Sequence, residues 1–406
     1  MTQTLISAAQ SISPLLIGWA KGQPPSKEQK QQLIAWESRY LGRIWQASSQ
    51  QLSGTESGDI ESRNIESRSI EERAALLQRV VARLESSSQN AQNEPAEQNE
   101  LAEQNESAKQ TVLPLPGSWS DWIAMLWILW LPLAQQLDRK QKALGRPLVQ
   151  GILGGQGTGK TTLCKMLRLV LAELDHETVP LSIDDLYLTY AQRQALLKTD
   201  DRLMWRGPPG THDISLGIET VTAMRRAISG ETVSVPQFDK SLYEGQGDRA
   251  APLLCSAPTI ILFEGWFVGA TPLPPNRFDQ GDLPAPIHTP ADRQFAKDCN
   301  ERLAQYQSLW NFLDALIVLC PRDYRLSVQW RQEAEQKMKA SGKSGLSDDE
   351  IAAFVTYFWK ALHPELFITP LTHSEKTDLV VYIEPDHSVG DLSAPAFGHS
   401  EKVNCV

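Results

Sequence analysis

A glycine-rich stretch at residues 154–161 has the composition of a loop that binds phosphate. It reads GGQGTGKT, fits the pattern G-x-x-x-x-G-K-[ST], and stands between an expected strand and an expected helix. Glycines let successive backbone N–H groups turn toward an anion, and the N-terminus of the following helix adds positive charge. We therefore expect a nucleotide's phosphates here rather than a plain glycine-rich turn. The expected binding residues are Gly154, Gly155, Gln156, Gly157, Thr158, Gly159, Lys160, Thr161 and Thr162.

Two side chains of this loop and one acid elsewhere are suited to a nucleotide and its metal ion. Lys160 would neutralise the outer phosphate oxygens, and the Thr161 hydroxyl would face Mg²⁺. Glu264 ends an apolar run, PTIILFEGW, and a carboxylate at that position binds Mg²⁺ directly or through water. We expect Thr161 and Glu264 to be the metal-binding residues.

Two adjacent acids, Asp184 and Asp185, follow the apolar run TVPLSI. If that run is a strand parallel to the one before the glycine loop, both acids lie at the sheet edge where open α/β sheets bind ligands. A kinase that acts on an alcohol needs a carboxylate there to accept the hydroxyl proton. Neighbouring residues point in different directions, so one acid would face the substrate while the other serves Mg²⁺ or the structure. The alternative for Asp185 is the N-cap of a helix over residues 185–197.

The elements that would position these residues alternate along the chain from residue 113 onward. Apolar runs without polar alternation are separated by helical stretches such as 162–174, which is typical of a parallel sheet covered on both faces. We expect a three-layer α/β domain over residues 113–390 and a C-terminal tail over residues 391–406. The expected strands are 147–153, 178–183, 258–263, 314–319 and 378–383.

The chain before residue 113 has a different composition. A capping box at Ser26 starts an expected helix in an N-terminal helical segment, residues 1–47. Residues 48–112 are polar and repetitive, with IESR and AEQNE each occurring twice, and we expect a low-complexity linker. A second capping box, at Ser69, starts one helix inside that linker.

The composition also limits the partners of the protein. Lys and Arg total 39 against 49 Asp and Glu, and the net charge of −10 repels nucleic acid and anionic membranes. The longest apolar run, residues 122–133, is shorter than the ~20 residues that span a bilayer, so we expect a buried helix. Widely spaced cysteines and the lack of a basic N-terminal region favour a cytoplasmic location. The sequence leaves the oligomeric state open, a monomer included.

The remaining motifs indicate which kind of phosphate-loop protein this is. The chain has no N-K-x-D, D-x-x-G or LSGGQ, which disfavours a GTPase switch and a transporter ATPase. An ordered series of other motifs follows: SIDDLYLT, RGPPGTHD, PQFDKS, GQGDR, FEGW and WRQEAE. In these motifs, over residues 113–385, the chain resembles the D-glycerate 3-kinases of plants and cyanobacteria. These are P-loop kinases related to phosphoribulokinase, uridine kinase and pantothenate kinase.

The resemblance implies transfer of phosphate from MgATP to the 3-hydroxyl of D-glycerate, which gives the 3-phosphoglycerate of photorespiration. It aligns Asp184 with the acid that serves as catalytic base. Glycerate has a carboxylate, so its pocket needs cations or N–H donors. The cations of the motif segments are candidates, and structural ion pairs are the alternative. The substrate-binding residues on this basis are Asp185, Tyr187, Arg206, His212, Asp213, Asp239, Lys240 and Arg249.

Residues 321–345 correspond to a lid helix in the same kinase group. Arg331 is the expected catalytic arginine of this lid, which would neutralise charge on the moving phosphoryl group, and a solvated basic helix is the alternative. Residues 383–388, IEPDHS, depart from the family's pattern near the adenine end of the site. The rival functions are a kinase for uridine, pantothenate or ribulose 5-phosphate, and an ATP-binding regulatory module without catalysis.

Overall fold

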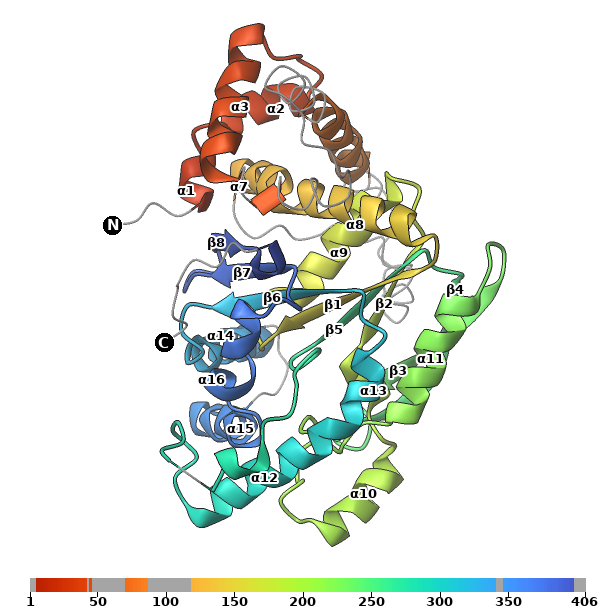
Figure 1. Cartoon of the computed structure of the whole chain (residues 1–406), viewed down its shortest axis with the longest axis vertical. Coiled ribbons are helices and arrows are strands. Elements are labelled where there is room, and N and C mark those ends of the chain that lie inside the picture. The colour runs from red at the N-terminus through yellow and green to blue at the C-terminus, as the bar shows by residue number, and fades with distance from the viewer. Residues whose placement is uncertain are drawn as a thin grey trace. The chain divides into compact units, whose positions relative to one another are not determined.

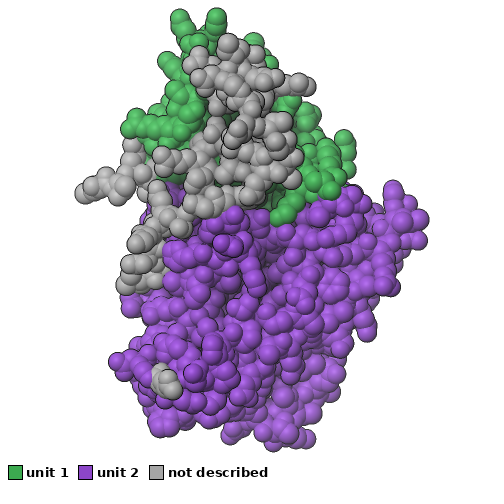
Figure 2. Space-filling view, viewed as in Figure 1, with its two compact units in different colours: residues 1–143, 165–176 green, residues 144–164, 177–406 purple. Residues whose placement is uncertain are grey.

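The chain divides into two compact units (Figure 2). Unit 1 comprises residues 1–143 and 165–176, and unit 2 comprises residues 144–164 and 177–406. The computed structural model describes residues 5–41, 44–45, 70–86, 118–279, 281–340 and 346–397. The repeats of the expected linker and Ser69 therefore lie outside the described residues, and the expected domain boundaries stay predictions.

Unit 1 is built from helices. The expected capping box at Ser26 is confirmed, because its hydroxyl accepts the Gln29 N–H while the Gln29 side chain accepts the Ser26 N–H. The helix expected after Ser69 is present from residue 70. The described helices are α1 (Leu5–Ala9), α2 (Ser13–Ala20), α3 (Lys27–Tyr40), a helix over residues 70–86, α7 (Trp119–Met125) and α8 (Leu131–Leu144).

The apolar run at residues 122–133 is helical and buried, as expected. A π-helical turn, Leu126–Trp130, joins α7 to α8, whose second residue is Pro132. Such a turn accommodates a residue that has no N–H to donate to the α-helical ladder. Trp122 packs on Trp130 with ring centroids 4.8 Å apart. None of the helices in the described ranges is long and apolar enough to cross a membrane.

Unit 2 contains a six-stranded sheet with the strand order β2-β5-β1-β6-β7-β8 (Figure 1). Neighbouring strands pair in parallel, except that β8 is antiparallel to β7. The strands are β1 (Leu148–Gly154), β2 (Thr178–Ser182), β5 (Ile260–Gly265), β6 (Ala315–Pro321), β7 (Leu379–Ile383) and β8 (Val389–Ser393). The five expected strands are confirmed, whereas β8 was not expected and extends past residue 390.

A second sheet of two antiparallel strands was also missed. It consists of β3 (Thr232–Asp239) and β4 (Asp248–Ser256). The first residues of β3 alternate between exposed and buried, and β4 is exposed or half-buried throughout. Neither strand therefore has the continuous apolar run of a parallel sheet. The motif segments 236–241 and 245–249 lie at the end of β3, in the turn and at the start of β4.

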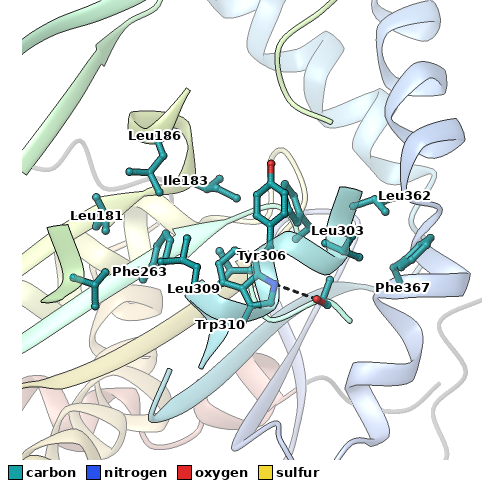
Figure 3. Packing of buried hydrophobic residues seen from close by; sticks show 14 of the residues in the cluster. Leu181, Ile183, Leu186, Phe263, Leu303, Tyr306, Leu309, Trp310, Leu362 and Phe367 are labelled. Atoms are coloured by element: carbon teal, nitrogen blue, oxygen red, sulfur yellow. Dashed lines mark hydrogen bonds between the residues drawn. The ribbon is translucent and has the colours of Figure 1, made fainter. Parts of the chain in front are cut away.

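Helices pack on the sheet through one large apolar cluster. Val149, Ile261 and Phe263 of the sheet belong to this cluster, and Figure 3 shows Tyr306 and Trp310 within it. The helices that contribute are α11 (Ile214–Arg226), α12 (Pro290–Leu303), α13 (Gln307–Trp310) and α16 (Pro364–Phe367). The remaining helices are α9 (Lys160–Ala172), α10 (Tyr190–Thr199), α14 (Leu326–Ala340) and α15 (Asp348–Ala361).

The opposite face of the sheet is buried as well. Ile152, Leu262 and Ile317 point away from the cluster by strand alternation, and each is at most 1% exposed. Burial on both faces is what strands without polar alternation require, so this part of the expected three-layer architecture is confirmed.

The carboxyl ends of β1, β2 and β5 meet at one edge of the sheet. Glu264 on β5 stands beside Ile152 of β1 on one side and Ser182 of β2 on the other. β1 ends where the glycine loop begins, and Asp184 follows β2 within a single turn. The register therefore brings the glycine loop, the acid pair and Glu264 to the same edge.

Candidate active site

The glycine loop turns from β1 into α9 with two glycines in the left-handed region. Gly157 has φ +78° and Gly159 has φ +86°, which residues with side chains rarely adopt. The Thr158 hydroxyl donates to the Gly155 carbonyl oxygen at 2.9 Å. The turn is therefore fixed by its own hydrogen bond and by residues that tolerate the backbone conformation.

Lys160 is the cation of this loop. Its ammonium donates to the Gly155 carbonyl oxygen at 3.0 Å. Burial lowers the pKa of Lys160, and the negative charges of Glu264 and Asp184 oppose that shift. Thr161, the next residue of α9, is exposed, as is Thr162. The loop thus combines a half-buried cation with two acids close enough to influence its ionisation.

Trp330 of α14 and His387 of the β7–β8 turn pack against the glycine loop. A Cβ added at Gly157 would lie 2.6 Å from the Trp330 Cβ. The His387 ring stacks on Trp330 with centroids 4.6 Å apart, and its Nδ1 is 3.1 Å from the Gly157 carbonyl oxygen. Its Nε2 is 3.3 Å from a Glu333 carboxylate oxygen. The segment 383–388, which we associated with the adenine end of the site, therefore contacts the loop itself.

This close approach makes a prediction for Gly157. We expect Gly157→Ala to lower the free energy of unfolding by about 2–4 kcal/mol, because a left-handed alanine costs ~1–2 kcal/mol and the new methyl overlaps Trp330. Gly159→Ala is the matched control, since Gly159 has a similar φ but no atom within 4 Å of an added Cβ. Chemical denaturation measures both variants. Equal losses would show that the Trp330 contact contributes nothing.

Asp184 is held by two donors. It lies in a 3₁₀ turn, Ile183–Leu186, that starts at Ser182. Its Oδ1 accepts the Tyr187 hydroxyl at 2.8 Å, and its Oδ2 accepts the Lys240 ammonium at 2.6 Å. Burial raises the pKa of Asp184, but the charge and hydrogen bond of Lys240 and the hydrogen bond of Tyr187 hold it below its ordinary value. Asp184 is therefore ionised at neutral pH and able to accept a proton.

Asp185 has a structural environment. Its carboxylate accepts the Ser182 N–H at 3.2 Å and the Phe238 N–H at 3.3 Å, which ties the 3₁₀ turn to β3. Burial raises the pKa of Asp185 to about 7 against these two hydrogen bonds. The alternative that Asp185 caps the following helix was wrong, because Thr189 caps α10. Asp185 instead closes the capping box of the 3₁₀ turn.

Tyr187 and His212, two of the expected substrate-binding residues, are buried. They are 4% and 5% exposed, and their rings stack with centroids 4.6 Å apart. The His212 Nδ1 is 2.7 Å from the Tyr306 hydroxyl, and burial lowers the pKa of His212 to about 3. The imidazole is therefore neutral, and neither side chain leaves much surface for a substrate to contact.

Arg249 and Asp213 bind each other. The Arg249 guanidinium is 2.7 Å from the Asp213 carboxylate and also donates to the Tyr187 carbonyl oxygen at 3.2 Å. Asp213 in addition caps α11 by accepting the Leu216 N–H at 3.0 Å. This is the structural ion pair that the sequence left as an alternative for Arg249.

Arg206, Asp239 and Lys240 lie around the β3–β4 turn. Arg206 donates to the carbonyl oxygens of Gly245 and Gln246 at 2.7 and 3.0 Å. Asp239 accepts the N–H and hydroxyl of Ser241. The Lys240 side chain is 58% exposed although it reaches Asp184. Of the expected substrate cations, Lys240 is thus both exposed and in contact with the expected base.

Comparison with known proteins identifies relatives of this chain. No family model matches the chain. The chain is 34% identical to the chloroplastic D-glycerate 3-kinase of Arabidopsis thaliana over 261 residues, which cover 61% of this chain and 54% of that protein. It is 33% identical to the uncharacterized kinase mug58 of Schizosaccharomyces pombe over 236 residues, which cover 55% of this chain and 82% of that kinase. The chain belongs to the D-glycerate 3-kinase family of P-loop kinases.

A solved structure supports the same assignment of fold. The D-glycerate 3-kinase from Cryptococcus neoformans matches with a TM-score of 0.56 and 25% identity, over 64% of this chain and 99% of that one. Because the chain spans only about half the length of the Arabidopsis relative, membership of the D-glycerate 3-kinase family does not transfer that protein's activity by itself. The expected cytoplasmic location also stays a prediction, since that relative is named as chloroplastic.

The lid helix expected for the D-glycerate 3-kinase family is α14. Arg331 lies 3.2 Å from the Glu335 carboxylate, and its guanidinium stands over the Phe354 ring of α15. The α14 side chain that meets Gly157 is its neighbour Trp330. The other lid arginines are also paired, Arg322 with Glu384 and Asp391, and Arg325 with Asp323. The catalytic role of Arg331 stays a prediction.

The residues expected to bind Mg²⁺ in this kinase family fit it by donor type. Thr161 has a hydroxyl at the start of α9, and Glu264 has a half-buried carboxylate near the end of β5. Within the described ranges no group of three or more His, Cys, Asp or Glu side chains could hold a metal ion. Mg²⁺ at nucleotide sites is usually bound by one or two protein oxygens together with phosphate oxygens, so the small donor set is compatible.

Three residues of the site were missed from the sequence. Trp330 stands beside Arg331 in WRQEAE, but only the arginine has a charge that suggests a role. His387 lies in the segment that departs from the family's pattern, and Tyr306 lies in no motif. A tyrosine or histidine whose hydrogen-bond partner is distant in the chain has no local sequence signal.

Proposed function

We propose that this chain is an ATP-dependent kinase that phosphorylates D-glycerate at its 3-hydroxyl to give 3-phosphoglycerate. The observation that carries the proposal is the place of the Asp184 carboxylate: it lies at the sheet edge of the glycine loop, accepts hydrogen bonds from Tyr187 and Lys240, and is within electrostatic reach of Lys160. The names of the Arabidopsis and Cryptococcus relatives support D-glycerate as the acceptor. With that acceptor the reaction would return photorespiratory carbon as 3-phosphoglycerate.

The residues of the site have separate tasks in this reaction. The 3-hydroxyl oxygen forms a bond to the γ-phosphorus while the bond from that phosphorus to the β,γ-bridging oxygen breaks, and ADP leaves. Asp184 accepts the hydroxyl proton, and Lys160 neutralises charge on the phosphate oxygens. Mg²⁺, held by Thr161 and Glu264, would supply further charge neutralisation at the phosphates.

We assign the carboxylate of the acceptor to Lys240 and Arg206. Lys240 uses one of its three N–H donors on Asp184, and Arg206 uses one nitrogen on backbone carbonyls, so both retain donors for an anion. Arg249 and Asp213 form an ion pair, and Asp239 accepts a hydrogen bond from Ser241 in the β3–β4 turn. We therefore assign a structural role to these three residues. Arg331 would act on the phosphoryl group only after leaving Glu335.

A panel of acceptors tests the choice of D-glycerate. We expect ADP release, followed in a coupled assay with MgATP, to depend on D-glycerate and to give 3-phosphoglycerate as the product. Uridine, pantothenate and ribulose 5-phosphate are the competing acceptors, because kinases of related sequence use the same P-loop. Turnover with one of these acceptors and none with D-glycerate would reject D-glycerate while leaving the kinase assignment in place.

A further inference from the structure

The backbone, the ring and the hydroxyl of Tyr187 are each held by other residues. Its backbone segment is bridged to the next motif by two hydrogen bonds, from the Asp213 N–H to the Leu186 carbonyl oxygen at 2.7 Å and from the Leu188 N–H to the Thr211 carbonyl oxygen at 3.0 Å. Its ring lies between two others, stacked on His212 at 4.6 Å and edge-on to Phe238 at 5.0 Å. The hydroxyl donates to Asp184 Oδ1 at 2.8 Å.

His212 is itself held by Tyr306. The Tyr306 hydroxyl oxygen accepts the Gly210 N–H at 3.0 Å and lies 2.7 Å from the His212 Nδ1. Tyr306 is fully buried against Phe267 and Trp310, and Figure 3 shows its hydroxyl pointing away from Trp310. The ring that supports Tyr187 is thus anchored in the apolar core.

The two oxygens of Asp184 consequently have unlike partners. Oδ1 faces the buried Tyr187, which is 4% exposed, and Oδ2 faces Lys240, whose side chain is 58% exposed. A substrate can displace or share an exposed ammonium, but it cannot reach past a buried tyrosine. Oδ2 is therefore the oxygen available to the hydroxyl of an acceptor.

We propose that Tyr187 is a positioning residue, held by His212 and Tyr306, that fixes the Asp184 carboxylate for proton acceptance at Oδ2 and does not itself bind the acceptor. This rests on the proposed function, because it takes Asp184 as the base of the kinase. It differs from the sequence expectation, which placed Tyr187 and His212 among the substrate-binding residues.

Tyr187→Phe is the direct test, since it keeps the stacked ring and removes only the hydroxyl. Loss of one hydrogen bond to the carboxylate raises the pKa of Asp184, so the acid limb of kcat/KM is expected to move up by about 0.5–1 pH unit. We expect kcat to fall about 5–10-fold, with KM for ATP and for the acceptor within about twofold. The other groups facing Asp184 are Lys240, His212, Asp185 and Lys160, and the substitution changes none of them.

His212→Asn tests the supporting ring. The asparagine amide keeps a polar atom for the hydrogen bond with the Tyr306 hydroxyl, but no ring remains to stack on Tyr187. We expect the same upward movement of the acid limb, smaller than for Tyr187→Phe. Tyr243→Phe is the matched control, because Tyr243 is 53% exposed and stacks on Tyr190 of α10. Its pH profile should superpose on that of the unsubstituted protein.

Two outcomes would overturn the proposal. A rise in KM for the acceptor in Tyr187→Phe with an unmoved acid limb would make Tyr187 a binding residue. An Asp184 pKa that is unchanged in Tyr187→Phe would show that the hydroxyl has no effect on the carboxylate. This pKa is measured without any acceptor by ¹³C NMR of labelled aspartate carboxyls, with Asp184→Asn assigning the signal. Because the NMR titration needs no turnover, it separates failure of this proposal from failure of the proposed function.

Discussion

Asp184→Asn is expected to lower kcat about 10²–10⁴-fold while ATP still binds, because the amide cannot accept the proton of the acceptor's hydroxyl. The amide oxygen can still accept the Tyr187 hydroxyl, but the amide N–H₂ would face the Lys240 ammonium, donor against donor. Lys240 is therefore expected to swing into solvent, where most of its side chain already lies. The size and shape of the residue are unchanged, so the 3₁₀ turn capped by Ser182 should persist.

The measurement separates chemistry from binding. kcat comes from acceptor-dependent ADP release, the affinity for ATP from calorimetry, and folding from thermal unfolding of the same preparation. Asp349→Asn is the matched control, because Asp349 is an exposed acid in the first turn of α15 and should keep normal turnover. Turnover near normal in Asp184→Asn would remove Asp184 from the role of base and direct attention to Asp185.

The parts of the fold that could be predicted are those with a local pattern. β1, β2, β5, β6 and β7 have no exposed residue, so their sequences are apolar without alternation and stand out from the helices. Because parallel strands end at a common edge, the residue types at those ends were enough to place Lys160, Asp184 and Glu264 together.

What could not be predicted depends on distant partners. β3 and β4 are partly exposed and pair only with each other, so their sequences lack the run that marks a buried strand. Spacing alone also left open which of Asp184 and Asp185 is the base, and only the family resemblance favoured Asp184. In the structure the two acids differ in their distant partners, because the Lys240 ammonium contacts Asp184 and the Phe238 N–H donates to Asp185.

Lys160→Met is expected to lower kcat about 10²–10³-fold, because the site loses the charge that faces the outer phosphate oxygens. The same substitution should leave the free energy of unfolding unchanged or raise it. Lys160 is half-buried, and this burial lowers its pKa, which means that the folded protein stabilises the ammonium less well than water does. Methionine fills a similar volume without a charge to desolvate.

The prediction is specific because kcat should fall while the free energy of unfolding does not. A residue that served only the fold would lose activity together with stability, whereas Lys160 should lose activity alone. Lys165→Met provides the control on the same helix, because Lys165 is exposed and its substitution should change neither quantity by much. Parallel losses of kcat and stability in Lys160→Met would mean that attraction to Glu264 and Asp184 outweighs the cost of burial, and that the ammonium is part of the folded loop before any phosphate arrives.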